Sequence, residues 1–244
     1  APATTSAPST APATTAPEPQ PVDADTAAAI ADVLAASPEG CDPLDPRHCY
    51  LPYPSNHFTV ADAASATSLR VRFPAAGAPV NTAGVPIDMS EINRNDGFSP
   101  NSTLMTYLEG ADWEATVLPP WTDLGSSLAD DATVVLIDAA TGDRVPLWAE
   151  RDSNAPDPAD QSLIVHPAVA LTEGATYVVG IRGVIGADGQ PLDPNPVFRS
   201  YRDRLVTDIA AVEDRRPAMD AALAALDAAG IARDDLQLAW DFSI

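Results

Sequence analysis

TVVLIDAATGDRVPLW, residues 133–148, is the stretch that decides the fold class. Its two apolar runs, 133–138 and 144–148, are rich in β-branched residues and flank a turn that contains Thr141-Gly142-Asp143. Two such runs separated by a short glycine-containing turn are typical of a β-hairpin. The stretch therefore predicts two antiparallel strands that pair with each other.

The same pattern continues on both sides of this stretch. Residues 162–166 and 175–181 form two more β-rich runs, and Asp188-Gly189 supplies a further turn. Upstream, 69–73 alternates apolar and charged residues, and 104–108 is a candidate short strand. Several short strands at this spacing favour a mainly β fold, an Ig-like antiparallel sandwich, over a parallel α/β sheet.

The C-terminal part has a different periodicity. Between residues 197 and 229 the larger apolar residues recur at helical intervals, with Pro217 expected to divide two helices or to lie in a first turn. Residues 236–242 alternate again, which predicts a final strand with one apolar face and one polar face. Because this pattern is still running at the last residue, we expect the chain to be truncated.

The N-terminal part is low in complexity. Residues 1–22 are almost entirely Ala, Pro, Thr and Ser, which predicts a flexible tether. Residues 25–37 predict one short, marginal helix that Asp25 or Thr26 would cap. The predicted organisation is a disordered tether with a marginal helix over 1–37, a loop-rich part over 38–130, an Ig-like β core over 131–196, and helices with a final strand over 197–244.

The charge composition excludes several classes of partner. The formal net charge is −22, and all 13 basic residues are arginine. Such a surface repels phosphate backbones and anionic lipid, so we expect neither nucleic-acid binding nor adsorption to acidic membranes. No apolar run is long enough to span a bilayer. A chain without lysine but rich in Ala, Pro, Arg and Asp is typical of the high-GC genomes of actinobacteria.

Cys41 and Cys49 are the only cysteines, and their close spacing predicts one small disulfide. Free thiols are an alternative, as is a zinc site that adds His48, although the adjacent His48 and Cys49 are awkward ligands for one tetrahedron. A disulfide would place the chain in an oxidising compartment, outside the cell or on its surface.

No catalytic motif is evident in the sequence. Gly125-Ser126-Ser127 lacks the second glycine of a nucleophile elbow. We expect surface or structural roles for His48, His57 and His166, and a phosphate loop of the Walker type would need a lysine. The sequence therefore predicts no catalytic residue and no cofactor.

Two sets of residues are candidates for binding. One loop could present oxygen atoms to calcium, but a solvated acidic turn is the preferred interpretation, so we expect no metal; its residues are Asp152, Asn154, Asp157 and Asp160. The four tryptophans could line a carbohydrate or lipid groove, or more simply close the core; they are Trp113, Trp121, Trp148 and Trp240.

A resemblance to known families rests on short motifs. One stretch resembles bacterial Ig-like domains of secreted proteins. The residues that carry the resemblance are Pro167-Ala168, Leu171, Gly174, Tyr177-Val178-Val179, Gly183-Val184 and Asp188-Gly189-Gln190-Pro191-Leu192. More widely, the order of motifs along the chain resembles that of the N-terminal region of bacterial extracellular lipases. These motifs are Asp96-Gly97-Phe98-Ser99, the Ig-like stretch, a helix with Tyr201 and Leu205, Ala232-Arg233-Asp234-Asp235, and Trp240-Asp241-Phe242. The order is also similar to that of uncharacterised actinobacterial secreted proteins.

The resemblance implies an α/β-hydrolase domain after this region, and it carries no catalytic residue onto this chain. The first functional hypothesis is a non-catalytic accessory module of a secreted hydrolase-like protein, whose partner would be that hydrolase domain in the same polypeptide. The alternative is a surface-displayed binding or adhesion module on a flexible tether. A self-contained enzyme is the third hypothesis.

Overall fold

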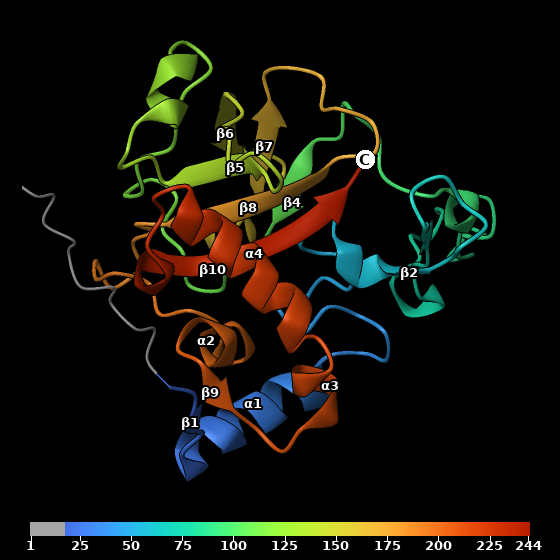
Figure 1. Ribbon diagram of the computed structural model, residues 1–244, viewed down its shortest axis with the longest axis horizontal. Coiled ribbons are helices and arrows are strands. Elements are labelled where there is room, and N and C mark those ends of the chain that lie inside the picture. The colour runs from blue at the N-terminus through green and yellow to red at the C-terminus, as the bar shows by residue number, and fades with distance from the viewer. Residues whose placement is uncertain (1–17) are drawn as a thin grey trace, which may run out of the picture.

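Two three-stranded antiparallel sheets contain most of the strands in the computed structural model, which describes residues 18–244 (Figure 1). The mainly β, antiparallel fold that the sequence predicts is confirmed. In sheet order, the first sheet consists of β10 (Leu236–Ser243), β8 (Thr176–Arg182) and β5 (Val134–Asp138). The second consists of β4 (Leu104–Thr106), β7 (Leu163–Pro167) and β6 (Leu147–Arg151).

Four helices and two smaller strand pairs complete the fold of the described residues. The helices are α1 (Ala24–Ala36), α2 (Pro196–Arg202), α3 (Ala210–Glu213) and α4 (Arg216–Ala228). The smaller strands are β1 (Gln20–Pro21), parallel to β9 (Leu205–Val206), and β2 (Thr59–Ala61), antiparallel to β3 (Leu69–Val71). Short 3₁₀ turns are η1 (Asn56–Phe58), η2 (Ala75–Gly77), η3 (Ile92–Arg94), η4 (Leu124–Leu128), η5 (Pro158–Asp160) and η6 (Arg233–Asp235).

The predicted pairing of residues 133–138 with 144–148 as a hairpin is wrong. The ladder begins as expected, because the Val145 N–H donates to the Leu136 carbonyl at 2.8 Å. The next N–H that could continue this ladder toward β5 is that of Leu147, and it donates to Ser127 Oγ at 3.0 Å instead. Pro146 between them faces the other side, where its carbonyl accepts from Ala168. The chain therefore leaves β5 after Val145, and β6 pairs with β7 in the other sheet.

The predicted N-terminal helix is confirmed, with a different cap. Asp23 precedes α1, and its carboxylate accepts a hydrogen bond from the Thr26 N–H at 2.8 Å. Asp25, one of the two expected caps, lies inside the first turn, where an acidic residue favours the positive end of the helix dipole. Residues 1–17 of the predicted tether lie outside the described residues.

The C-terminal helix α4 packs closely on the first sheet. Pro217 lies in its first turn, one of the two positions expected for it, where the missing N–H costs no intrahelical hydrogen bond. A Cβ atom added to Gly180 of β8 would lie 3.1 Å from a Leu236 methyl and 3.2 Å from a Leu226 methyl. The absent side chain of Gly180 thus lets α4 approach the sheet.

Strand β10 is present as predicted, and its face opposite the apolar residues is largely covered as well. Leu238, Trp240 and Phe242 on one face are at most 2% exposed, and Gln237 and Ala239 on the other are only 8% and 0% exposed. Both faces are covered because helices contact the sheet that carries β10 (Figure 1). None of the helices in the described part of the chain has the length and apolar character needed to span a bilayer.

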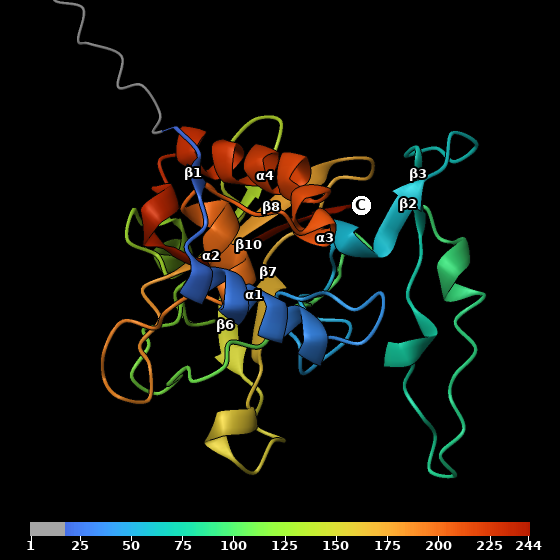
Figure 2. The same cartoon turned by 90° about the horizontal axis from the view of Figure 1, so that it is seen from below.

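Residues 59–95, which we call the arm, pack on the core through Val71 and Phe73, and the loops of the arm extend away from the remainder of the fold (Figure 2). Figure 2 shows β2, β3 and the following loops to one side of the helices and sheets. The loop folds back on itself through a bridge between Val80 and Pro86. Several large apolar side chains of the arm are exposed to solvent; they are Val60, Val80, Val85, Ile87 and Ile92.

Candidate functional site

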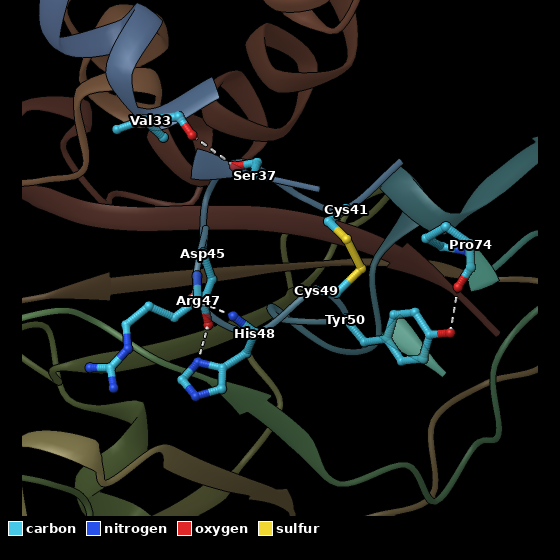
Figure 3. The surroundings of a disulfide bond; sticks show 9 residues. All are labelled: Val33, Ser37, Cys41, Asp45, Arg47, His48, Cys49, Tyr50 and Pro74. Carbon is cyan, nitrogen blue, oxygen red and sulfur yellow. Dashed lines mark hydrogen bonds and ion pairs between the residues drawn. A yellow bond between two sulfur atoms is a disulfide. The ribbon is translucent and has the colours of Figure 1, made fainter. Parts of the chain in front are cut away.

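A disulfide between Cys41 and Cys49 closes a loop of residues 41–49, which we call the disulfide ring (Figure 3). The predicted bond is confirmed, and the Cα atoms of the two cysteines are 4.5 Å apart. The alternatives of free thiols and of a zinc site with His48 are therefore wrong. The His48 ring instead faces Asp45, with Nδ1 3.0 Å from the Asp45 carboxylate.

A buried ion pair joins the disulfide ring to the start of α4. Asp42 is 0% exposed, and its two carboxylate oxygens accept from the Arg215 guanidinium at 2.6 and 3.0 Å. Burial alone would raise the pKa of Asp42, but the charge and hydrogen bonds of Arg215 hold it below its usual value. Asp42 therefore stays ionised, and its charge is neutralised by a residue far along the chain.

A half-buried carboxylate, that of Asp241, lies in the same region. We call the set the buried ionic cluster; its members are Asp42, Arg215, His57, Asn56 and Asp241. Burial raises the pKa of Asp241, although Asn56 donates to its carboxylate at 2.7 Å and Arg215 adds a favourable charge. Burial also lowers the pKa of His57, against the attraction of Asp42. The cluster joins η1, β10, α4 and the disulfide ring.

The outer side of the disulfide ring carries Arg47, which reaches across to two other segments. Its guanidinium donates to Tyr107 Oη at 2.5 Å and to the Asp160 carboxylate at 2.6 Å. Asp160 was a candidate calcium ligand, and in the structure it is an ion-pair partner instead. Burial raises the pKa of Asp45, although His48 opposes this shift.

The rest of the candidate calcium loop is built from local turns. The Asp152 carboxylate accepts from the Asn154 N–H at 2.8 Å, and Asp157 accepts from the Ala159 N–H at 2.9 Å. Within residues 18–244, the structure holds no group of three or more His, Cys, Asp or Glu arranged to bind a metal ion.

The tryptophans occupy three kinds of position. Trp113 and Trp240 are buried, and their indole N–H groups donate to backbone carbonyls at 3.1 and 2.7 Å. Trp148 is half-buried and stacks on His166, its cross-strand neighbour, with ring centroids 4.6 Å apart. Trp121 is 74% exposed. The structure does not bring the four side chains together in one groove.

The serines after Gly125 have backbone partners. Ser126 Oγ donates to the Asp123 carbonyl, and Ser127 Oγ donates to the Leu124 carbonyl while it accepts from the Leu147 N–H. These contacts hold η4 against the start of β6.

A cavity of about 220 Å³ adjoins the disulfide ring, and we call it the ring cavity. Its wall comes from Val33 of α1, from the ring, from residues 107–109 after β4, from residues 192–196 at the start of α2, and from the start of β10. No pattern in the sequence indicates this cavity, because its five segments are separated along the chain. Nor did the sequence indicate the pairing of Asp42 with Arg215, which are 173 residues apart.

Comparisons of this chain with family models, curated proteins and solved structures found no match. The chemistry of the site therefore rests on its own geometry. The disulfide ring and the buried ionic cluster connect segments from the two ends of the described chain.

Removal of the disulfide is expected to lower the free energy of unfolding by about 2–3 kcal/mol, as chain-entropy arithmetic gives for so short a loop. The test is urea denaturation of Cys41→Ala/Cys49→Ala beside the unchanged protein, each with and without reductant. Reductant should destabilise the unchanged protein to the level of the double variant and leave the variant unaffected. Equal stability of the unchanged protein and the double variant in the absence of reductant would contradict a stabilising role of the disulfide.

Glu213 is expected to make stability depend on acid pH. Hydrogen bonds from Arg216 and Thr207 lower the pKa of Glu213 from 4.5 to about 2. Burial acts in the opposite direction but is the weaker effect. Because the folded pKa is the lower one, ionised Glu213 stabilises the protein fully above about pH 4.5, and this contribution is lost as the pH falls toward 2.

The measurement is the stability difference between Glu213→Gln and the unchanged protein from pH 7 to pH 2. The difference should be largest near neutrality and should shrink between pH 4.5 and 2. Glu173→Gln is the control, because Glu173 is exposed and forms no ion pair within the described residues. A difference for Glu213→Gln that does not change over this range would contradict the assignment.

Proposed function

We propose that this chain is a non-catalytic accessory module of a secreted bacterial hydrolase-like protein, and that the arm contacts the hydrolase domain. We further propose that the two three-stranded sheets face each other as an Ig-like sandwich. The module would serve as a rigid support, with the disulfide ring and the buried ionic cluster fixing the base from which the arm extends.

The arm is the observation that carries this proposal. Val80, Val85 and Ile87 near its end are 61%, 55% and 50% exposed. Neighbouring apolar side chains left in water mark surfaces that contact another protein. Residues 59–95 contain three arginines and three acidic residues, so the arm is formally neutral in a chain of net charge −22. Another domain can therefore approach the arm with less repulsion than elsewhere.

The disulfide supports the proposed location. Such bonds form and persist in oxidising compartments, which for a bacterium are the cell envelope and the exterior. The acidic surface suits a protein that must remain soluble there.

The first experiment is to read the gene beyond codon 244. The proposal expects an α/β-hydrolase domain with a nucleophile elbow in the same frame. A stop codon or a membrane anchor directly after this region would contradict it. In addition, the chain of residues 1–244 is expected not to hydrolyse p-nitrophenyl esters, and turnover by the chain alone would overturn its non-catalytic role.

The second experiment tests the arm in the complete polypeptide. Val80→Ser/Val85→Ser/Ile87→Ser should leave the stability of this module nearly unchanged, because the three side chains are already exposed. It should lower the melting temperature of the hydrolase domain, because the contact between them is weakened. The control is Val169→Ser/Val206→Ser, which removes exposed apolar side chains outside the arm. Equal effects of the two variants would contradict a role for the arm.

A surface-displayed binding module is the second candidate function, and the loop of residues 117–128 favours it. Val117 is 81% exposed and Trp121 is 74% exposed. Large exposed aromatic residues are frequent anchors of binding interfaces. This function predicts that the chain sediments with insoluble cell-wall polysaccharide and that Trp121→Ala abolishes sedimentation, whereas Trp148→Ala does not.

A further inference from the structure

The side-chain amide of Asn56, in η1, has a buried oxygen without a hydrogen-bond donor. Its nitrogen Nδ2 donates to the Asp241 carboxylate oxygen Oδ2 at 2.7 Å and to Ser243 Oγ at 3.1 Å. Among the described residues, no group donates to the buried oxygen Oδ1. The opposite orientation of the amide is unfavourable, because its oxygen would then face an ionised carboxylate oxygen at 2.7 Å. Since an unpaired buried acceptor is costly, a donor at this position would stabilise the fold.

The charged and titratable groups around Asn56 come from the disulfide ring, α2, η1 and the start of α4, and none of them supplies this donor. The Arg215 guanidinium donates to Asp42 at 2.6 and 3.0 Å. The Tyr201 hydroxyl of α2 donates to a backbone carbonyl at 3.0 Å. Burial lowers the pKa of His57, which favours the neutral imidazole. The carboxyl group of Asp241 is therefore the remaining source of a proton.

The charges of the buried ionic cluster are unbalanced when Asp241 is ionised. Asp42 and Arg215 neutralise each other, so the Asp241 carboxylate is a surplus negative charge beside them. Burial raises the pKa of Asp241, and the charge of Asp42 adds to this effect, whereas Asn56 and Arg215 oppose it. A proton on Asp241 would remove the surplus charge. Because Asp241 is only half-buried, solvent can deliver that proton.

We propose that Asp241 binds a proton from solvent and that its carboxyl O–H donates to Asn56 Oδ1, which makes the pair a proton-controlled joint between β10 and η1. A protonated carboxyl group offers one donor and one acceptor, and a primary amide offers the complementary two. Protonated Asp241 therefore forms two hydrogen bonds with Asn56, whereas ionised Asp241 forms only the one at 2.7 Å.

The joint controls how firmly the arm is held. η1 ends at Phe58, and β2, the first strand of the arm, begins at the next residue. A second hydrogen bond between η1 and β10 therefore fixes the base of the arm more firmly in acid than at neutral pH. This control operates whatever the arm contacts, so it does not depend on the proposed function.

The first test is Asp241→Asn, because the new amide carries the missing donor at every pH and has no charge. Its nitrogen can donate to Asn56 Oδ1 while its oxygen accepts from Asn56 Nδ2. We expect its melting temperature at pH 7 to exceed that of the unchanged protein by about 3 °C or more. Protonated Asp241 stabilises the unchanged protein fully below about pH 3.8, and this contribution is lost as the pH rises through the higher folded pKa. The gain should therefore shrink as the pH falls from 7 toward 3.8.

Two control variants separate the hydrogen bond from the charge. Asp241→Leu is similar in size and removes the charge, but it offers no donor, so it should not gain stability at pH 7. Asp227→Asn removes one charge at an exposed position outside the cluster and should change the melting temperature by less than about 1 °C. If Asp241→Asn is no more stable than the unchanged protein at pH 7, or if either control gains as much, the proposed joint is wrong.

The second test follows the proton in the unchanged chain of residues 1–244 by NMR. The ¹³C resonance of the Asp241 carboxyl carbon, assigned by its absence in Asp241→Asn, should titrate clearly above pH 3.8. The side-chain NH₂ resonances of Asn56 should shift with the same midpoint. At pH 7 the backbone amides of residues 56–61 should exchange with solvent several-fold more slowly in Asp241→Asn than in the unchanged protein, and the two rates should converge near pH 4. A carboxyl titration at or below pH 3.8, or equal exchange at pH 7, would overturn the proposal.

Discussion

Arg215→Ala is expected to lower the free energy of unfolding by about 3–5 kcal/mol, because it leaves the Asp42 carboxylate buried without its counter-charge. Asp42 is 0% exposed and receives two hydrogen bonds from Arg215, at 2.6 and 3.0 Å. The measurement is urea denaturation at pH 7, followed by circular dichroism. Arg94→Ala is the control, because Arg94 pairs with Glu91 at the surface and both side chains are at least 75% exposed.

The exposed pair should contribute less than about 1 kcal/mol. Similar losses for Arg215→Ala and Arg94→Ala would contradict the importance of burial. A second variant, Asp42→Asn/Arg215→Met, removes both charges together. It should be more stable than Arg215→Ala, because an unpaired buried charge costs more than the loss of the pair. If the double variant is the less stable of the two, the stabilisation comes from packing rather than from charge.

Trp240→Ala is expected to cost about 3–5 kcal/mol, as is usual when a fully buried aromatic side chain is truncated. Trp240 is 0% exposed, and its Nε1–H donates to the Pro54 carbonyl at 2.7 Å. The side chain thus joins β10 to the segment that leads into η1 and the arm. Trp240→Phe keeps most of the apolar bulk and removes the hydrogen bond, so it should cost about 1–3 kcal/mol.

The measurement is again urea denaturation, with Trp121→Ala as the control because Trp121 is 74% exposed. The control should change stability by less than about 0.5 kcal/mol. A loss for Trp240→Ala no larger than that of the control would show that β10 does not hold the base of the arm.

These two expected effects concern one structural arrangement. Trp240 and Asp241 are neighbours on β10, and both contact the segment 54–56, through Pro54 and Asn56 respectively. The start of α4 contacts the disulfide ring through Arg215. Segments from the two ends of the described chain therefore stabilise each other where the arm begins, so loss of either contact should also loosen the arm.

Local patterns in the sequence were sufficient for the individual elements. Strands were expected within 133–138, 162–166, 175–181 and 236–242, and the structure contains β5, β7, β8 and β10 there. These predictions succeed because β-branched runs and period-two alternation act through neighbouring residues. The disulfide could also be predicted from the sequence, because its two cysteines are only eight positions apart.

Partner choice was decided by the tertiary structure. The hairpin of 133–148 fails because the Leu147 N–H donates to Ser127 rather than to β5, and the strand with which β6 then pairs lies later in the chain. The burial of Gln237 and Ala239, opposite the apolar face of β10, is also a tertiary effect, because helices contact that sheet and no alternation pattern within the strand reveals them.

The sequence by itself determined the antiparallel β class, the first helix, the disulfide and the acidic surface, all of which follow from composition and short-range spacing. Only the tertiary structure decided that Asp42 would meet Arg215 across 173 residues and that five separate segments would enclose the ring cavity. The physical reason is that burial and charge pairing depend on which surfaces the folded chain brings together, and no local pattern encodes that choice.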